Sequence, residues 1–266
     1  GVKGAAVATI LGQIASAIII TRYFVKKGNM RLKKENIRIN PELIKYSVAL
    51  GTSSCITQVS AVVLQIILNN SLVKYGDMTE IGGDVALSAM GVVLKVSMIL
   101  LAINIGIGTG AQPIFGYNRG ARNYERIKKT YITAAAASTI VSVIGWIACI
   151  AFPGAIISIF GNDNVMFTHF GIRCLRIYMF GIFTSGFQMI TTTYFQATGQ
   201  AMKASILSML RQMILLIPFV IILPLFMGLD GILYAGPSAD FLAALIIACF
   251  TVKEMKRLNA EIEAAK

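Results

Sequence analysis

The sequence is poor in charged residues. Asp, Glu, Lys and Arg make up 14% of its 266 residues, whereas hydrophobic residues make up 56% and the mean hydropathy is +0.73. A soluble domain carries roughly 25% charged residues, so this chain has too few to cover a water-facing surface of ordinary size. The shortage excludes an ordinary soluble protein and leaves long apolar stretches to face lipid.

Cysteine and histidine are scarce as well, which argues against several kinds of site. The cysteines are far apart, in apolar segments and without paired spacing: Cys55, Cys149, Cys174 and Cys249. Neither a disulfide framework nor a zinc site is indicated. His169 is the single histidine, so a set of metal ligands is not expected. There is also no HExxH motif and no pair of carboxylates inside an apolar segment, so we expect neither a metal site nor an enzyme.

The apolar stretches are continuous and long enough for membrane helices. A helix needs roughly 20 apolar residues to cross about 30 Å of hydrocarbon, whereas a barrel strand needs about ten residues of alternating polarity. Charged residues divide the chain into seven predicted spans: about 4–21, 46–73, 85–113, 131–152, 165–196, 204–226 and 231–252. We therefore predict an all-α integral membrane protein with about seven transmembrane helices in the lipid bilayer.

Positive charge is concentrated in alternate connections. The 24 Lys and Arg outnumber the 12 Asp and Glu and give a net charge of +12. The connections after the first, third and fifth predicted spans and the C-terminal tail carry 8, 5, 1 and 4 Lys or Arg, against 1, 0 and 0 in the other connections. The positive-inside rule places the basic segments in the cytoplasm. It also explains the charge without nucleic acid as a partner.

The longest polar stretch, 22–45, divides the predicted spans unequally. It carries eight basic residues, and Asn40 followed by Pro41 indicates the start of a helix near its end. We expect 1–21 to be the last helix of a first bundle, 22–45 a cytoplasmic linker, and 46–266 a second bundle of six helices with a cytoplasmic tail. The start at Gly1, without Met or a signal peptide, resembles the middle of a longer protein.

Several stretches together resemble the multidrug and toxic compound extrusion (MATE) family of secondary antiporters. They are GVKGAAVAT at 1–9, QPIFGYNRGARNYERIKK at 112–129, YFQATGQ at 194–200, SMLRQMILLIP at 208–218 and GLDGILYAGPSAD at 228–240. In that order they match the sixth helix of the family, the loop after its eighth, its tenth and eleventh helices, and the beginning of its twelfth. The resemblance implies two six-helix lobes, of which this chain holds the last helix of the first lobe and the whole second lobe.

The resemblance also implies a function. Members of the family export small amphipathic or cationic drugs in exchange for Na⁺ or H⁺ by alternating access, here across a bacterial-type inner membrane. No cofactor other than the coupling ion is expected, and the first lobe would be the partner. The second predicted span lacks the glutamate that some members carry. Two alternatives stay open: a flippase for lipid-linked precursors, for which Lys95, Arg176 and Arg211 would supply a basic cavity, and an inactive isolated lobe.

Charged residues inside predicted spans are the sharpest site candidates. Lys95 lies roughly 15 Å along its span, where a charge costs roughly 2.5–3.5 kcal/mol. We expect Lys95 to face the bundle interior or a water-filled cavity, either as a cavity residue or in a structural ion pair. Asp240 lies at similar depth and could pair with Lys95 or Arg211, or take part in proton coupling.

Other candidates rest on polarity and on the resemblance. Cavity candidates besides Lys95 are Gln58, Gln65, Asn104, Arg176 and Gln188. Each uncharged one could equally join helices to one another, at about 0.6 kcal/mol per contact. The resemblance makes Thr9, the threonine of GAAVAT, a candidate for cation coupling beside Asp240. We also expect a cytoplasmic turn at 116–120, where glycine, tyrosine and asparagine follow one another.

Overall fold

The computed structural model describes residues 2–26, 41–161 and 165–264, and every regular element within these ranges is helical. The all-α prediction is therefore confirmed. The chain falls into two units, residues 1–49 and 50–266. Residues 27–40, the greater part of the predicted linker 22–45, lie outside the described residues. The lobe and linker boundaries at 21 and 45 stay a prediction.

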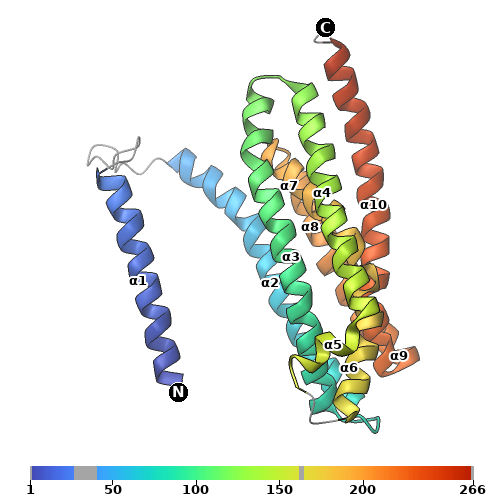
Figure 1. Cartoon of the computed structure of the whole chain (residues 1–266). Coiled ribbons are helices and arrows are strands. Elements are labelled where there is room, and N and C mark those ends of the chain that lie inside the picture. The colour runs from blue at the N-terminus through green and yellow to red at the C-terminus, as the bar shows by residue number, and fades with distance from the viewer. Residues whose placement is uncertain (1, 27–40, 162–164, 265–266) are drawn as a thin grey trace. The chain divides into compact units, whose positions relative to one another are not determined.

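The first unit contains α1, Val2–Lys26, and the beginning of α2, Pro41–Gly76 (Figure 1). The central part of α1 is an apolar helix over Ala6–Arg22. Its large hydrophobic side chains, among them Ile18 and Ile19, are exposed. In water this exposure would be costly, so α1 has the surface of a membrane helix.

The second unit is a bundle of long helices that lie side by side (Figure 1). After α2 its elements are α3 Gly83–Gly120, α4 Tyr124–Ala151, α5 Pro153–Ser158, α6 Val165–Tyr178, the 3₁₀ segment η2 Met179–Thr184, α7 Ser185–Ala197, α8 Ala201–Met209, the π-helical segment η3 Leu210–Leu216, α9 Ile217–Met227 and α10 Leu229–Ala264. The predicted fifth span thus corresponds to α6, η2 and α7. The predicted sixth span corresponds to α8, η3 and α9.

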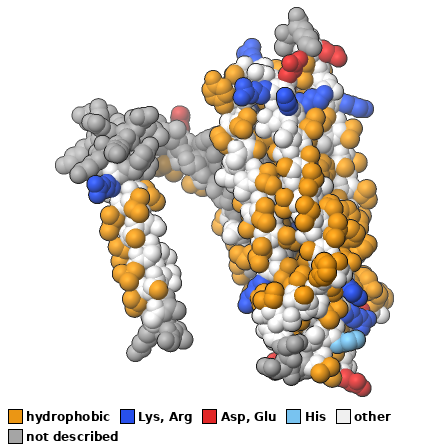
Figure 2. Space-filling model, in the orientation of Figure 1, with side chains coloured by type: hydrophobic (Ala, Val, Ile, Leu, Met, Phe, Trp, Pro, Cys, Tyr) orange, Lys and Arg blue, Asp and Glu red, His pale blue; other side chains and the backbone are white. Residues whose placement is uncertain are grey.

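Four helices in the described part are long and apolar enough to cross a membrane: Gly83–Gly120, Tyr124–Ala151, Met202–Met227 and Leu229–Ala264. Each agrees with a predicted span. The total of about seven spans stays a prediction. Figure 2 shows why a membrane is needed, because hydrophobic side chains cover the visible face of the second unit between bands of Lys and Arg. Among the exposed hydrophobics are Ile140, Ile144 and Ile147 on α4 and Leu242 and Leu245 on α10.

Inside the bundle, small residues let helices approach closely. A Cβ atom on Gly186 of α7 would lie 2.4 Å from the Ser138 carbonyl oxygen of α4. Any larger residue would push the two helices apart, and backbone cannot move aside as a flexible side chain can. Such contacts between small residues are the usual means of helix association in lipid.

The turn expected at 116–120 is wrong. Helix α3 continues through Pro113 to Gly120, and the connection to α4 is Ala121–Asn123, with Arg122 in the left-handed region at φ 56°. The helix continues because Phe115 is fully buried within it and because the Asn118 side chain donates a hydrogen bond to the Ile114 carbonyl at 2.8 Å. Its glycines and asparagine therefore serve helix packing and not a turn.

Candidate functional site

The most unusual feature of the second unit is an ion pair inside its membrane helices. Asp240 lies eleven residues after Leu229, about 17 Å along α10, and is 4% exposed. The Nε atom of Arg211, in η3, donates to its Oδ1 atom. An isolated carboxylate in hydrocarbon would be strongly destabilised, and the Arg211 guanidinium supplies the opposite charge beside Asp240.

Two irregular helical segments and a proline lie at this ion pair. Arg211 is the second residue of the π-helical segment η3. Gly181 belongs to the 3₁₀ segment η2, and Pro237 lies within α10 one turn before Asp240. A Cβ atom on Gly181 would lie 2.6 Å from the Asp240 Cβ atom and 3.1 Å from the Pro237 Cα atom. Irregular turns often mark hinges or functional sites, because they free backbone groups and re-aim side chains.

Gln188 connects α7 to the backbone of Asp240, beside the ion pair. Its side chain is 5% exposed, and its Nε2 atom donates to the Asp240 carbonyl oxygen at 3.1 Å and to Thr184 Oγ1 at 2.9 Å. Its Oε1 atom is buried and has no hydrogen-bond partner among the described residues. Gln188 was predicted to line a cavity or to join helices. Its contacts join α7, η2 and α10.

Aromatic rings and an apolar groove adjoin the pair. Trp146, Phe180, Phe183 and Phe241 contact one another with ring centroids 5.6–6.1 Å apart. A groove of about 380 Å³ next to them is lined by Ile150, Arg176, Ile177, Phe180, Tyr234 and Pro237. The exposed Arg176 is therefore part of an apolar groove, and its role as a cavity residue stays a prediction. This combination suits a flat amphipathic molecule, because stacking on rings needs no matched hydrogen bonds.

Asn104 lies in a separate polar cluster between α3, α4 and α7. It is fully buried, and its Nδ2 atom donates to Ser142 Oγ at 2.9 Å. Its Oδ1 atom accepts from Ser138 Oγ at 2.7 Å, and Ser185 Oγ lies 3.4 Å from Nδ2. These contacts join α3, α4 and α7, so Asn104 takes the helix-joining alternative and not the cavity role.

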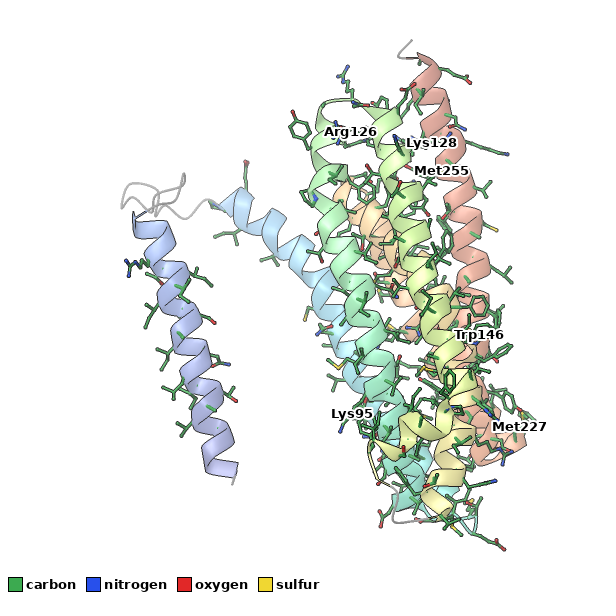
Figure 3. All side chains as sticks on the ribbon, viewed as in Figure 1. Lys95, Arg126, Lys128, Trp146, Met227 and Met255 are labelled. Carbon is green, nitrogen blue, oxygen red and sulfur yellow. The ribbon has the colours of Figure 1, made fainter. Side chains whose placement is uncertain are left out.

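Lys95 lies on the surface of the second unit. Its side chain is exposed on α3 (Figure 3), outside the interior of the second unit. No carboxylate of the described residues lies within ion-pair distance of it, and Asp240 pairs with Arg211 instead. Lys95 lies on α3 and Arg176 on α6, whereas Arg211 is paired with Asp240. The flippase alternative stays a prediction.

Four further polar or charged residues lie on α1, α2 and α6. Gln58 and Gln65 are exposed on α2, where Gln65 Nε2 donates to Asn69 Oδ1 at 3.1 Å. Thr9 is exposed on α1, in the first unit. Arg173, on α6, forms an ion pair with Asp230 at 2.7 Å. Within the described ranges, no three His, Cys, Asp or Glu side chains are placed to hold a metal ion.

Sequence reasoning missed a second charged cluster, centred on Glu254. This residue lies beyond Val252, where the apolar part of α10 ends, and is buried. Its carboxylate accepts from Gln200 at 2.7 Å, Tyr194 at 3.2 Å and Lys203 at 3.3 Å. Burial opposes ionisation, yet the hydrogen bonds and the Lys203 charge hold the pKa of Glu254 below its usual value. A second ion pair, Arg119–Glu261 at 2.8 Å, ties α10 to the end of α3.

Comparison with known proteins gives a consistent result. The MatE family model matches residues 53–222. The multidrug export protein MepA of Staphylococcus aureus strain N315 is 25% identical over 249 residues, which cover 92% of this chain and 52% of MepA. The chain thus spans about half the length of the curated relatives it matches.

Solved structures agree in fold. An outward-facing multidrug resistance MATE family transporter of the MOP superfamily superposes with a TM-score of 0.84 at 20% identity, covering 98% of this chain and 57% of that one. The MATE multidrug transporter DinF-BH gives a TM-score of 0.81 at 30% identity, covering 94% and 55%. Both similarities extend over nearly the whole of this chain and little more than half of the neighbour.

Proposed function

This chain belongs to the MatE family, and from that premise we propose that it works in multidrug efflux as the second lobe of an antiporter, with the last helix of the first lobe. The observation that carries the proposal is the family match over 53–222 together with the similarity to half of MepA. The helices make it a multi-pass membrane protein, and the bacterial relatives support the plasma membrane. It acts as a transporter and not as an enzyme.

The substrates we propose are small amphipathic or cationic drugs. The aromatic groove beside Phe180 and Tyr234 supports the amphipathic part, because apolar walls with few polar groups accept many flat molecules. Arg176 disfavours a cationic group close to it. A cation would therefore bind elsewhere in the transporter, for example between the two lobes.

Transport would follow alternating access, driven by Na⁺ or H⁺. The Arg211–Asp240 pair supports a role for the second lobe as one stiff body, because it ties η3 to α10 within the apolar part of the bundle. A carboxylate that holds a guanidinium is poorly suited to take up and release a proton, since each protonation would leave a charge without its partner. We therefore assign Asp240 to the structure of the lobe, and the coupling ion to a site that involves the first lobe and Thr9.

The test uses a transporter that contains this chain together with a first lobe. In cells that lack other exporters, ethidium accumulation is measured with the Na⁺ gradient, the pH gradient, both or neither imposed. We expect export to stop when one of the two gradients is abolished. Export that continues without either gradient would contradict antiport, and retention of ethidium under all conditions would contradict efflux.

A further inference from the structure

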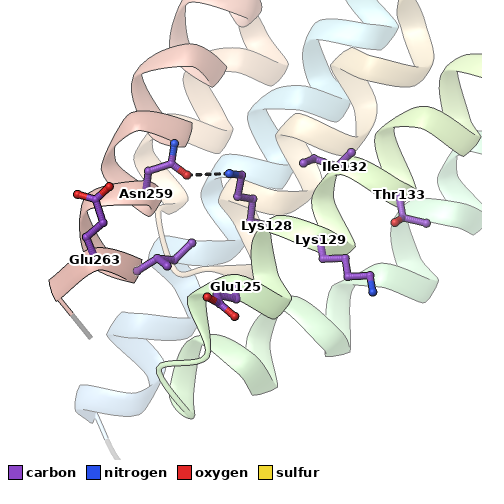
Figure 4. Close-up of a pocket in the computed structure, with 8 residues that line it drawn as sticks. Glu125, Lys128, Lys129, Ile132, Thr133, Asn259 and Glu263 are labelled. Atoms are coloured by element: carbon purple, nitrogen blue, oxygen red, sulfur yellow. Dashed lines mark hydrogen bonds between the residues drawn. The ribbon is translucent and has the colours of Figure 1, made fainter. Parts of the chain in front are cut away.

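A groove of about 580 Å³ lies between the beginning of α4 and the end of α10 (Figure 4). It is lined by Glu125, Lys128, Lys129, Ile132, Thr133, Asn259, Ile262 and Glu263. We propose that this groove binds the headgroup of a zwitterionic phospholipid that carries a primary ammonium beside its phosphate. The transport proposal does not require this site, and the site does not depend on transport.

The depth of the groove matches the headgroup layer. Lys128 and Lys129 come immediately before the predicted span that starts at 131, whereas α10 leaves its apolar part after Val252. Asn259 lies seven residues later, roughly 10 Å along the helix. The polar layer of a bilayer is about 5–8 Å thick on each side. Lys128 and Lys129 therefore lie within the headgroup layer, and Asn259 lies at its outer edge.

The surface next to the groove faces lipid. Ile132, at the groove, is 53% exposed, and Ile140 and Ile144 continue the exposed apolar row along α4. Figure 2 shows this orange face below a band of Lys and Arg at the end of the bundle that carries the C terminus. Ile132 and Ile262 give the groove an apolar part. A lipid seated there would place its acyl chains along the α4 row.

The charges of the groove select among headgroups. The lining holds two ammonium groups, on Lys128 and Lys129, and two carboxylates, on Glu125 and Glu263, and Figure 4 shows Glu263 and Lys129 on opposite sides of Lys128. The Lys128 Nζ atom donates to Asn259 Oδ1 at 2.8 Å, which holds it between the helices. An anionic headgroup would bring negative charge toward Glu263 and offer that carboxylate no positive group. A phosphate beside Lys129 with an ammonium beside Glu263 satisfies both signs of charge.

The headgroup must carry a primary ammonium, because a quaternary ammonium has no N–H group to donate a hydrogen bond. Phosphatidylethanolamine and phosphatidylcholine carry the same charges, yet only the first offers N–H donors to a carboxylate or to Asn259 Oδ1. A comparison of these two lipids therefore separates recognition of the headgroup from attraction to a surface. Phosphatidylglycerol, which has the phosphate alone, tests whether basic residues dominate.

The experiment is native mass spectrometry of the purified chain, delipidated in detergent and titrated with dioleoyl forms of these three lipids. We expect phosphatidylethanolamine to bind about two- to fivefold more tightly than either of the others, as one exposed charge-assisted contact would give. Equal binding of phosphatidylethanolamine and phosphatidylcholine, or tighter binding of phosphatidylglycerol, overturns the proposal. This first comparison needs no variant.

Two exposed substitutions then locate the site. Glu263→Gln should bring phosphatidylethanolamine down to the level of phosphatidylcholine, and Lys129→Gln should weaken both lipids. Lys256→Gln, on α10 and outside the groove, is the matched control and should change neither. Circular dichroism confirms that each variant keeps its helices. A preference for phosphatidylethanolamine that survives Glu263→Gln in a folded protein overturns the assignment to this groove.

Discussion

Arg211 and Asp240 form an ion pair that joins a π-helical segment to a proline-containing α-helix within the membrane. The two residues are 29 positions apart and belong to different predicted spans. Because Asp240 is almost fully buried while the Arg211 side chain is 35% exposed, the two partners should respond differently to substitution.

Removal of either partner should destabilise the lobe. The loss should be larger when Arg211 is replaced, because the buried Asp240 carboxylate then has no partner. We expect Arg211→Gln to cost about 2–4 kcal/mol in free energy of unfolding, because it leaves a buried anion unpaired. Asp240→Asn should cost less, since the Arg211 side chain reaches solvent or headgroups. Thermal unfolding of the purified protein in detergent measures both.

The double variant Arg211→Gln with Asp240→Asn provides the control. It should be more stable than Arg211→Gln alone, because no charge remains unpaired. An Asp240→Asn protein that folds as wild type and loses only proton coupling would show that the pair serves transport and not structure.

Gly181 should not tolerate a side chain. A Cβ atom there would overlap Asp240 and Pro237, so Gly181→Ala should destabilise the protein by about 1–3 kcal/mol through overpacking. Gly106→Ala is the matched control, because no atom outside its own helix lies within 4 Å of its Cβ position. The unfolding midpoint of Gly181→Ala should be lower than that of Gly106→Ala. Equal midpoints would show that η2 and α10 are not in close contact.

The Asn104 cluster should contribute to stability in proportion to its hydrogen bonds. Asn104→Leu removes the amide and leaves buried serine hydroxyls without their partner, which should cost about 1–3 kcal/mol. Gln65→Leu, on an exposed part of α2, should change stability by less than about 0.5 kcal/mol. Drug export should fall in the first variant only as far as the amount of folded protein falls. A loss of transport in a variant that is expressed at the normal level would show that Asn104 acts in the transport cavity.

Glu254 should make the protein sensitive to acid. Its pKa is lower in the folded state than in the unfolded state, so the stabilisation is present above the unfolded pKa of about 4.3 and is lost as pH falls through the folded pKa. Unfolding of wild type and Glu254→Gln is compared between about pH 3 and pH 6. The difference in stability should be largest near pH 6 and shrink toward pH 3. A constant difference over this range would exclude the carboxylate as its cause.

The sequence predicted the helices better than their irregular parts. Continuous apolar runs between charges set the helices, because lipid leaves the backbone few other conformations. The 3₁₀ segment at Met179–Thr184 has no comparable signal, since it is as apolar as the helices around it. The polar residues of the π segment at Leu210–Leu216, Arg211 and Gln212, do not distinguish a π helix from an α-helix. The prediction of a turn at 116–120 was wrong because residue types alone do not show how deeply a helix is buried. Glycine and asparagine weaken a helix, but burial of Phe115 outweighs them.

The candidate site shows a similar limit. The position of Asp240 and Arg211 within apolar spans indicated that both are site candidates. Only helix packing decides that these two form an ion pair and that Lys95 is not part of it. The choice depends on how each helix is rotated about its axis. The π segment changes that rotation, and nothing in a single sequence reports it.

The central claim is that this chain forms half of a gradient-driven drug exporter. The most direct measurement reconstitutes the transporter, with both lobes, in liposomes with an imposed Na⁺ or pH gradient and follows movement of ethidium across the membrane. We predict movement against the concentration gradient of ethidium that depends on one of the two ion gradients and disappears when it is collapsed. Movement only down the ethidium gradient, whatever ion gradient is imposed, would contradict the account.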